Sequence, residues 1–251
     1  PALYIKINGT WFQRGTPETG VPVLRLAIPL SGKDFSASYE IPFGVIERSQ
    51  KNGEEVPALQ FVRVTEISDN RKPGCLLLND SKYGFALNKN QLSATLIRSS
   101  YNPDPLPEIQ NHEINFALLP FSGKRNSADA INLARNFNHP IYLTGTDVHK
   151  GNLPPVADFV NIISSSAILS AVKKAEKSDA IIFRFYNSSE KKTEVTLKFN
   201  EIFLGKLKKA FQTDILEQPL KTQQISANGN SAKFAIPPTG ISTIAVFLEK
   251  S

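Results

Sequence analysis

A polar cluster directly after an apolar run is the part of this chain best suited to chemistry. Residues 76–78 are three leucines typical of a buried strand, and Asn79, Asp80, Lys82 and Tyr83 follow within five positions. Amide, carboxylate, ammonium and phenol groups at a strand end can orient the hydroxyl groups of a polar ligand by directed hydrogen bonds. In the alternative interpretation, Asp80 and Lys82 only cap a turn and satisfy backbone groups.

The histidines and the cysteine predict no metal centre in this chain. Zinc requires several ligands that converge in space, and His112, His139 and His149 form no His-x-x-x-His or comparable pattern. We expect structural or solvent-facing roles for them. Cys75, the single cysteine, lies beside an apolar run and is predicted to be a buried, inert thiol. A chain without an intrachain disulfide favours a reducing cytoplasm.

Composition argues against nucleic-acid and membrane partners. The net charge is +6, but the lysines are scattered along the chain, which is typical of solvated faces. No apolar run reaches the roughly 18 to 20 residues of a membrane span, and no signal peptide opens the sequence. Glycosylation sequons begin at Asn8, Asn79 and Asn187. Such three-residue patterns recur by chance and matter only on a secretory route.

Period-two alternation of apolar and polar residues dominates the chain. It is clear over residues 3–8, 23–28 and 194–199, and clusters of Gly, Asn, Ser, Asp and Lys separate these runs. Many short strands between turn signals indicate antiparallel β-sandwiches.

Helical patterns are few. Ser127 is predicted to cap one helix over residues 128–136, with an apolar stripe of Ala130, Ile131 and Ala134. Residues 167–177 also contain good helix formers, so propensity alone favours a second helix there.

The sequence between residues 74 and 120 closely resembles the C-terminal half of the class II α-mannosidases, glycoside hydrolase family 38. The resemblance rests on LLNDSKYG, on the LSATLIRSS strand with its Pro-Asp-Pro turn, and on HEINFALLP. Further matches occur in order along the chain: YEIPFGVIER, EVPALQFV, AVKKAEKSDAIIFRFYN and ISTIAVFLE. Ordered matches along nearly the whole chain are far more specific than any one short motif.

This resemblance implies a mainly β fold, with an antiparallel super-sandwich followed by a smaller β-sandwich and few short helices. Residues 167–177 then form a strand that enters a hairpin at residues 177–179, because tertiary pairing often overrides propensity. Residues 144–155, with two glycines and two prolines, are the best linker. We therefore expect a large β-sandwich domain over residues 1–148 and a small one over residues 149–251.

The family's catalytic groups have no counterpart in this chain. The resemblance places a zinc ion and an aspartate nucleophile in an N-terminal α/β domain and a following helical segment, and nothing here matches those parts. Retaining glycosidases need two carboxyl groups about 5 to 5.5 Å apart. Asp80 is the most suggestive acid, but Asp104 and Glu47 would reach it only through the fold. By resemblance, Asn79, Asp80, Lys82 and Tyr83 are candidates for the edge of a sugar pocket.

These inferences predict the C-terminal portion of a retaining, zinc-dependent α-mannosidase that is not catalytic alone. The expected partners are the N-terminal catalytic domain of the same parent chain and a mannose-containing oligosaccharide. Two other functions stay open: a stand-alone carbohydrate-binding module and a purely structural or oligomerisation module. Fold analogy does not choose between them.

Overall fold

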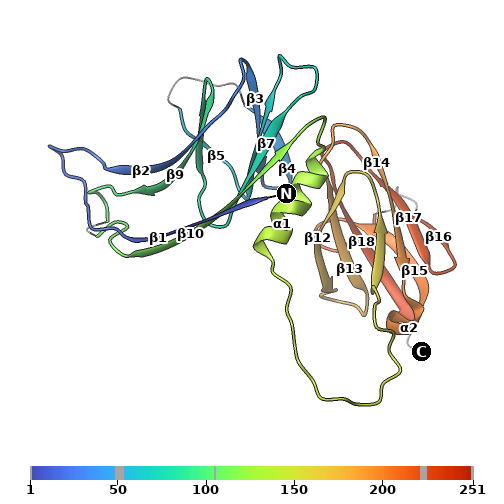
Figure 1. Ribbon diagram of the computed structural model, residues 1–251. Helices are drawn as coiled ribbons and strands as arrows, with labels where there is room; N and C mark the ends of the chain where they lie inside the picture. The colour runs from blue at the N-terminus through green and yellow to red at the C-terminus, as the bar shows by residue number, and fades with distance from the viewer. Residues whose placement is uncertain (1, 49–53, 105, 221–224, 250–251) are drawn as a thin grey trace. The chain divides into compact units, whose positions relative to one another are not determined.

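The chain divides into two compact units, Pro1–Ile141 and Tyr142–Ser251. The computed structural model describes residues 2–48, 54–104, 106–220 and 225–249 (Figure 1). Antiparallel sheets make up both units, which confirms the predicted mainly β fold. The predicted domain division after residue 148 falls within residues 140–159, which contain no helix or strand.

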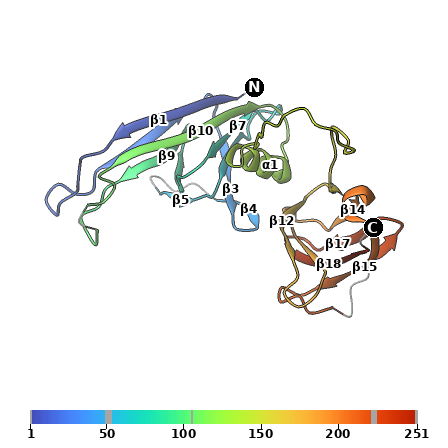
Figure 2. The same ribbon diagram turned by 90° about the horizontal axis from the view of Figure 1, so that it is seen from below.

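The first unit pairs a six-stranded sheet with a four-stranded sheet (Figure 2). In spatial order the larger sheet contains β1 (Leu3–Thr10), β10 (Asn111–Phe121), β7 (Gly74–Asn79), β6 (Phe61–Glu66), β3 (Phe35–Ile41) and β4 (Gly44–Glu47). The smaller sheet contains β2 (Val23–Pro29), β9 (Gln91–Arg98), β8 (Gly84–Asn88) and β5 (Val56–Pro57). β1 and β2 are therefore edge strands.

Alternation along the strands creates two apolar faces on the larger sheet. Val64 and Leu77 are fully buried in the core between the sheets. Leu76 and Leu78 alternate with Leu77 and so face the opposite side, where a helix packs against β6 and β7. That helix, α1 (Ser127–Asn138), is the one predicted from the apolar stripe, and the side chains of this stripe are fully buried.

The predicted cap of α1 was wrong by one residue. Asn126, not Ser127, is the N-cap, and its side-chain oxygen accepts a hydrogen bond from the Asp129 backbone N–H at 2.7 Å. Ser127 is already helical. The two residue types cap helices about equally well, so composition alone does not fix which of two neighbours takes the position.

The second unit is a smaller sandwich of two four-stranded sheets. One sheet contains β11 (Val160–Ile163), β14 (Thr193–Phe199), β17 (Ser231–Ile236) and β16 (Ser226–Asn228). The other contains β12 (Ala167–Lys174), β13 (Ile181–Asn187), β18 (Ile241–Glu249) and β15 (Lys206–Thr213). Buried aromatic and aliphatic side chains such as Phe185, Leu197 and Phe234 fill the space between them.

Residues 167–174 form strand β12, so tertiary pairing overrides their helical composition as expected. β12 pairs antiparallel with β13 across the turn at residues 175–180. A second helix, the single-turn α2 (Glu201–Leu204), was not predicted. Its signal is weak, since only the Asn200 cap and the terminating Gly205 mark it.

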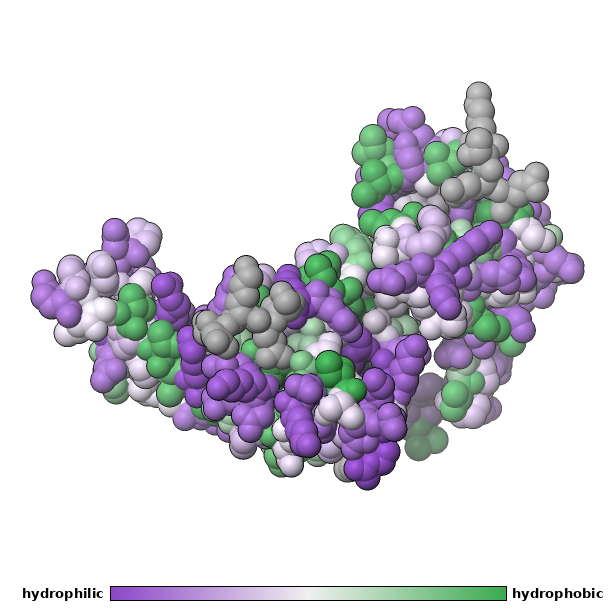
Figure 3. Space-filling view, turned by 90° about the horizontal axis from the view of Figure 1, so that it is seen from above, coloured by the Kyte–Doolittle hydropathy of each residue, from purple (hydrophilic) through white to green (hydrophobic). Residues whose placement is uncertain are grey.

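Hydrophilic side chains predominate on the face shown in Figure 3, and apolar side chains form small separate groups there. This distribution is expected when apolar residues are sequestered between sheets. Within the described part of the chain, neither helix has the length and apolar character needed to cross a membrane.

Candidate functional site

Asn79 ends β7 and is almost completely buried, with 1% of its surface exposed. Its Nδ2 donates to the Leu59 carbonyl at 2.8 Å, and its Oδ1 accepts from the Lys82 backbone N–H at 2.9 Å. The Asn79 side chain thus closes the turn that presents the next three residues. Because both ends of the amide are used inside the protein, its contribution to the site is to position that turn.

Asp80 is exposed at the first position of this turn, and its carboxylate is held by two neighbours. Oδ1 accepts from the Asn115 backbone N–H at 3.2 Å and from the Ser81 hydroxyl at 2.8 Å. Oδ2 accepts from Nδ2 of Asn115 at 2.7 Å. These bonds fix the carboxylate in one orientation on the surface of the larger sheet.

Lys82 and Tyr83 complete the turn. Lys82 is half-buried, and the side chain of Tyr83 is exposed. The backbone of Tyr83 is fixed, since its carbonyl accepts from the Ala58 N–H at 3.0 Å. The turn therefore groups the four predicted residues, with Asn79 inside the protein and the other three at its surface.

An open depression of about 440 Å³ lies beside Asp80. It is lined by Tyr4, Ile5, Lys6, Asp80, Asn115, Phe116, Phe137 and Asn138. Apart from Asp80, sequence reasoning did not single out any of these residues. They come from β1, β10 and α1, so only strand pairing and helix packing bring them together.

The other acids and the histidines do not complete a catalytic or metal site here. Glu47 is on β4, and two strands separate β4 from β7, which corresponds to roughly 14 Å at the usual strand spacing. Asp104 accepts the Leu106 N–H at 2.9 Å in the loop after β9. Across the described ranges, no three His, Cys, Asp or Glu side chains are grouped as metal ligands.

Two of the histidines lie within hydrogen-bond distance of backbone carbonyl groups, and the cysteine is buried. Nε2 of His112 lies 2.8 Å from the Glu108 carbonyl, and Nδ1 of the exposed His149 lies 3.2 Å from the Lys150 carbonyl. Cys75 is a free thiol in the core of the first unit. The predicted burial of Cys75 is confirmed, and burial raises the pKa of its thiol to about 11.

Asn187 repeats the role of Asn79 in the second unit. It ends β13 and is fully buried. Its Nδ2 donates to the carbonyls of Lys191 and Pro237 at 2.7 and 2.9 Å, and its Oδ1 accepts from the Ser166 hydroxyl at 2.8 Å and the Ser189 N–H at 3.1 Å. The sequons at Asn79 and Asn187 therefore start with side chains that the folded protein encloses.

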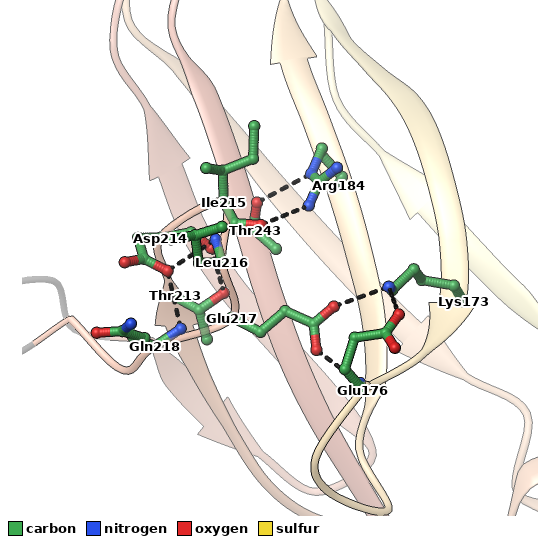
Figure 4. Close-up of polar contacts among 10 residues, drawn as sticks. All are labelled: Lys173, Glu176, Arg184, Thr213, Asp214, Ile215, Leu216, Glu217, Gln218 and Thr243. Carbon is green, nitrogen blue, oxygen red and sulfur yellow. Dashed lines mark hydrogen bonds and ion pairs between the residues drawn. The ribbon is translucent and has the colours of Figure 1, made fainter.

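A second polar cluster lies on the sheet of the second unit that contains β12 (Figure 4). Glu217 accepts from the Glu176 N–H at 2.8 Å and pairs with Lys173 at 3.0 Å, and both contacts lower the pKa of Glu217. Arg184 donates to the Ile215 carbonyl at 3.1 Å and to the Thr243 hydroxyl at 3.3 Å. These contacts tie the loop after β15 to β12 and β13, which is a structural role.

Two family descriptions match this chain. Residues 16–106 match the glycosyl hydrolases family 38 C-terminal domain, and residues 166–244 match the glycosyl hydrolases family 38 C-terminal beta sandwich domain. The first match falls in the first compact unit and the second match in the second.

Curated relatives carry α-mannosidase names. Alpha-mannosidase 2C1 of Mus musculus is 27% identical over 237 residues, which is 90% of this chain and 22% of that protein. An alpha-mannosidase of Saccharomyces cerevisiae is 30% identical over 167 residues, which is 63% of this chain and 15% of that protein. The chain thus spans about a fifth of the length of the curated relatives it matches.

Solved structures share the fold. A protein in glycosyl hydrolase family 38 from Enterococcus faecalis aligns with a TM-score of 0.77 and 17% identity, covering 99% of this chain and 28% of that one. An alpha-mannosidase from Enterococcus faecalis V583 aligns with a TM-score of 0.76 and 16% identity, covering 99% and 27%. These structures show the shared fold, and the two domain matches over residues 16–106 and 166–244 show that the chain belongs to glycosyl hydrolase family 38, as its C-terminal region.

Proposed function

We propose that this chain is the C-terminal β-sandwich portion of a retaining, zinc-dependent α-mannosidase that hydrolyses terminal α-mannose residues. The observation that carries the proposal is the match of both units to family 38 C-terminal domains, in a chain about a fifth as long as its relatives. The catalytic zinc and the acid pair would belong to an N-terminal domain of the same parent chain.

The turn after β7 is the proposed edge of the sugar pocket. Asp80, Lys82 and Tyr83 are presented at the surface, and Asn79 sets the geometry of the turn that carries them. A fixed carboxylate accepts hydrogen bonds from sugar hydroxyls, and an ammonium group donates to them. The hydrogen bonds of Asp80 to Asn115 favour this role, because they orient the carboxylate before a ligand arrives.

Exposed apolar side chains near this turn support a docked catalytic domain. Tyr83 is 56% exposed and Leu59 is 36% exposed, and both belong to segments that hydrogen-bond to the Asn79 turn. The edge strands β1 and β2 also expose Leu3, Val23 and Leu24. We expect this part of the surface to pack against the catalytic domain, because docking would bury these apolar side chains.

The cytoplasm is the proposed compartment, supported by a single free cysteine and by two of three sequons with buried asparagines. A mannose-containing oligosaccharide is the proposed substrate of the parent enzyme. A stand-alone carbohydrate-binding module remains the second candidate, favoured by the depression beside Asp80.

Steady-state kinetics on the parent enzyme with an aryl α-mannoside tests the proposal. An active, zinc-dependent parent whose kcat/KM falls on Asp80→Ala substitution is expected. A parent that hydrolyses no α-mannoside would overturn the proposed activity. If the Asp80→Ala and Lys82→Ala variants of the parent keep normal kinetics, these residues do not form the edge of the sugar pocket.

A further inference from the structure

We propose that the depression beside Asp80 is a binding site for a neutral pyranose, with Tyr4 and Phe137 as its aromatic wall and Asp80, Lys6 and Asn138 as its hydrogen-bonding groups. The site lies wholly within the first unit. The choice of mannose as the sugar rests on the proposed function, but the capacity to bind a pyranose does not.

Strand register places the polar groups in one row. Tyr4 and Lys6 alternate with Ile5 and Ile7, which pack into the core between the sheets, so the first two face the side that α1 covers. Lys6 is paired with Asn115 of β10, and Asn115 in turn holds Asp80. The row therefore crosses three neighbouring segments of the larger sheet.

The hydrogen-bonding capacity of this row is only partly used. A carboxylate offers about four lone-pair positions, and Asp80 fills three with Asn115 and Ser81, which leaves one on Oδ2. Lys6 directs one N–H to Glu113 at 2.8 Å and keeps two more. Donors and acceptors side by side suit hydroxyl groups, which both donate and accept.

The aromatic wall of the depression lies near the start of β1. The ring of Tyr4 stacks on that of Phe137 with centroids 6.4 Å apart and planes 18° apart. Tyr4 is nevertheless 74% exposed, so its other face is open. Aromatic faces carry partial negative charge and attract the weakly positive C–H groups of a sugar ring.

Asn138 closes the far side of the depression at the last residue of α1. Its amide N–H groups donate to the carbonyls of Asn79 and Ala134 at 3.1 and 2.9 Å. A ligand therefore meets only the Oδ1 acceptor of this side chain. The carbonyl end of a helix also favours hydroxyl donors over anions.

The charges of the site select a neutral ligand. Lys6 is the only cation among the lining residues and is already paired with Glu113, while Asp80 adds a negative charge to the lining, so a phosphate or carboxylate ligand would be repelled. A metal ion lacks ligands, since the described residues do not bring three acids, histidines or cysteines together here. Apolar walls with a few convergent polar groups are the usual composition of a small-molecule site.

Titration of the 251-residue chain with methyl α-mannopyranoside, followed by amide NMR shifts, tests this site. We expect saturable shifts at Tyr4, Lys6, Asn115 and Phe137 with a millimolar Kd. Tyr4→Ala and Asp80→Asn should each weaken binding about tenfold or more. Tyr4→Phe keeps the ring and should bind normally, and Tyr142→Ala, which removes a tyrosine that is 93% exposed in the other unit, should have no effect.

Absence of saturable shifts in the folded chain would overturn the site, as would normal binding by Tyr4→Ala. Thermal melts of each variant confirm that a loss of binding is not a loss of fold. A chain that binds no mannoside, beside a parent enzyme that hydrolyses α-mannosides, would refute this site and leave the proposed function standing. If the chain binds the mannoside but the parent enzyme hydrolyses none, the site is supported and the proposed function is refuted.

Discussion

Asn115 holds both carboxylate oxygens of Asp80, with its backbone N–H 3.2 Å from Oδ1 and its Nδ2 2.7 Å from Oδ2. The two residues are 35 positions apart and meet because β10 runs antiparallel to β7. This contact fixes the orientation of the exposed Asp80 carboxylate. It is the geometric basis for placing Asp80 at the edge of a sugar pocket.

Removal of the Asp80 carboxylate should impair the parent enzyme more than it impairs folding. Asp80→Ala is expected to lower kcat/KM by an amount that corresponds to about 1 to 3 kcal/mol, the value of a lost charged hydrogen bond. Lys82→Ala should have a similar effect if the ammonium group also meets the sugar. Steady-state kinetics and thermal melts on the same preparations measure both quantities. If the turn is only structural, the melting temperature falls and the folded enzyme keeps normal kinetics.

Glu40 should make the first unit less stable as the pH rises. It is 6% exposed, and its Oε2 accepts the Gln60 N–H at 2.8 Å. Burial raises the pKa of the Glu40 carboxyl, against the opposing effects of this hydrogen bond and of Arg135. The folded state therefore prefers the protonated acid. Its stability contribution is full below the ordinary carboxyl pKa and declines as the pH rises from there through the raised pKa.

Glu40→Gln keeps an acceptor for Gln60 and removes the charge. The variant should show a flatter dependence of unfolding free energy on pH and should be more stable than the wild type at neutral pH. Denaturant melts across the acidic to neutral range measure this, with Glu54→Gln as the control on an exposed residue of the same unit. A variant that parallels the wild type at every pH would contradict the account of Glu40.

Cys75 should be unreactive in the folded protein. With a pKa of about 11, about one thousandth of the thiol is ionised at pH 8, and the side chain is buried. Iodoacetamide should modify the native chain very slowly and the denatured chain rapidly, as read by mass spectrometry. Fast modification of native protein would show that the core around β7 opens readily.

Asn187→Ala should destabilise the second unit severely. The substitution removes every hydrogen bond of a side chain that is fully buried, including those to the Lys191 and Pro237 carbonyls and to the Ser189 N–H. A loss of about 2 to 4 kcal/mol in the free energy of unfolding is expected when several such bonds are lost together. Asn161→Ala, at an exposed position on β11, is the matched control and should change stability by less than about 0.5 kcal/mol.

Strand content and the polar turn were predictable because they are local features of the sequence. Period-two alternation marks β1 and β14 directly, and the run that ends at Asn79 marks the end of a buried strand. The strand at residues 167–174 was predictable only through resemblance, since its composition favours a helix and its pairing with β13 decides the outcome. The depression was not predictable, because Tyr4, Asn115 and Phe137 meet only through strand register and helix packing.

The central claim is that catalysis belongs to a separate domain and not to this chain. It is tested most directly by measuring aryl α-mannoside hydrolysis by the purified chain and by its intact parent, each with and without added zinc. The account predicts zinc-dependent turnover by the parent and none by residues 1–251, because the described residues bring no three candidate metal ligands together and the proposed zinc ion and acid pair belong to the N-terminal domain. Zinc-dependent turnover by the chain alone that survives repurification would contradict it.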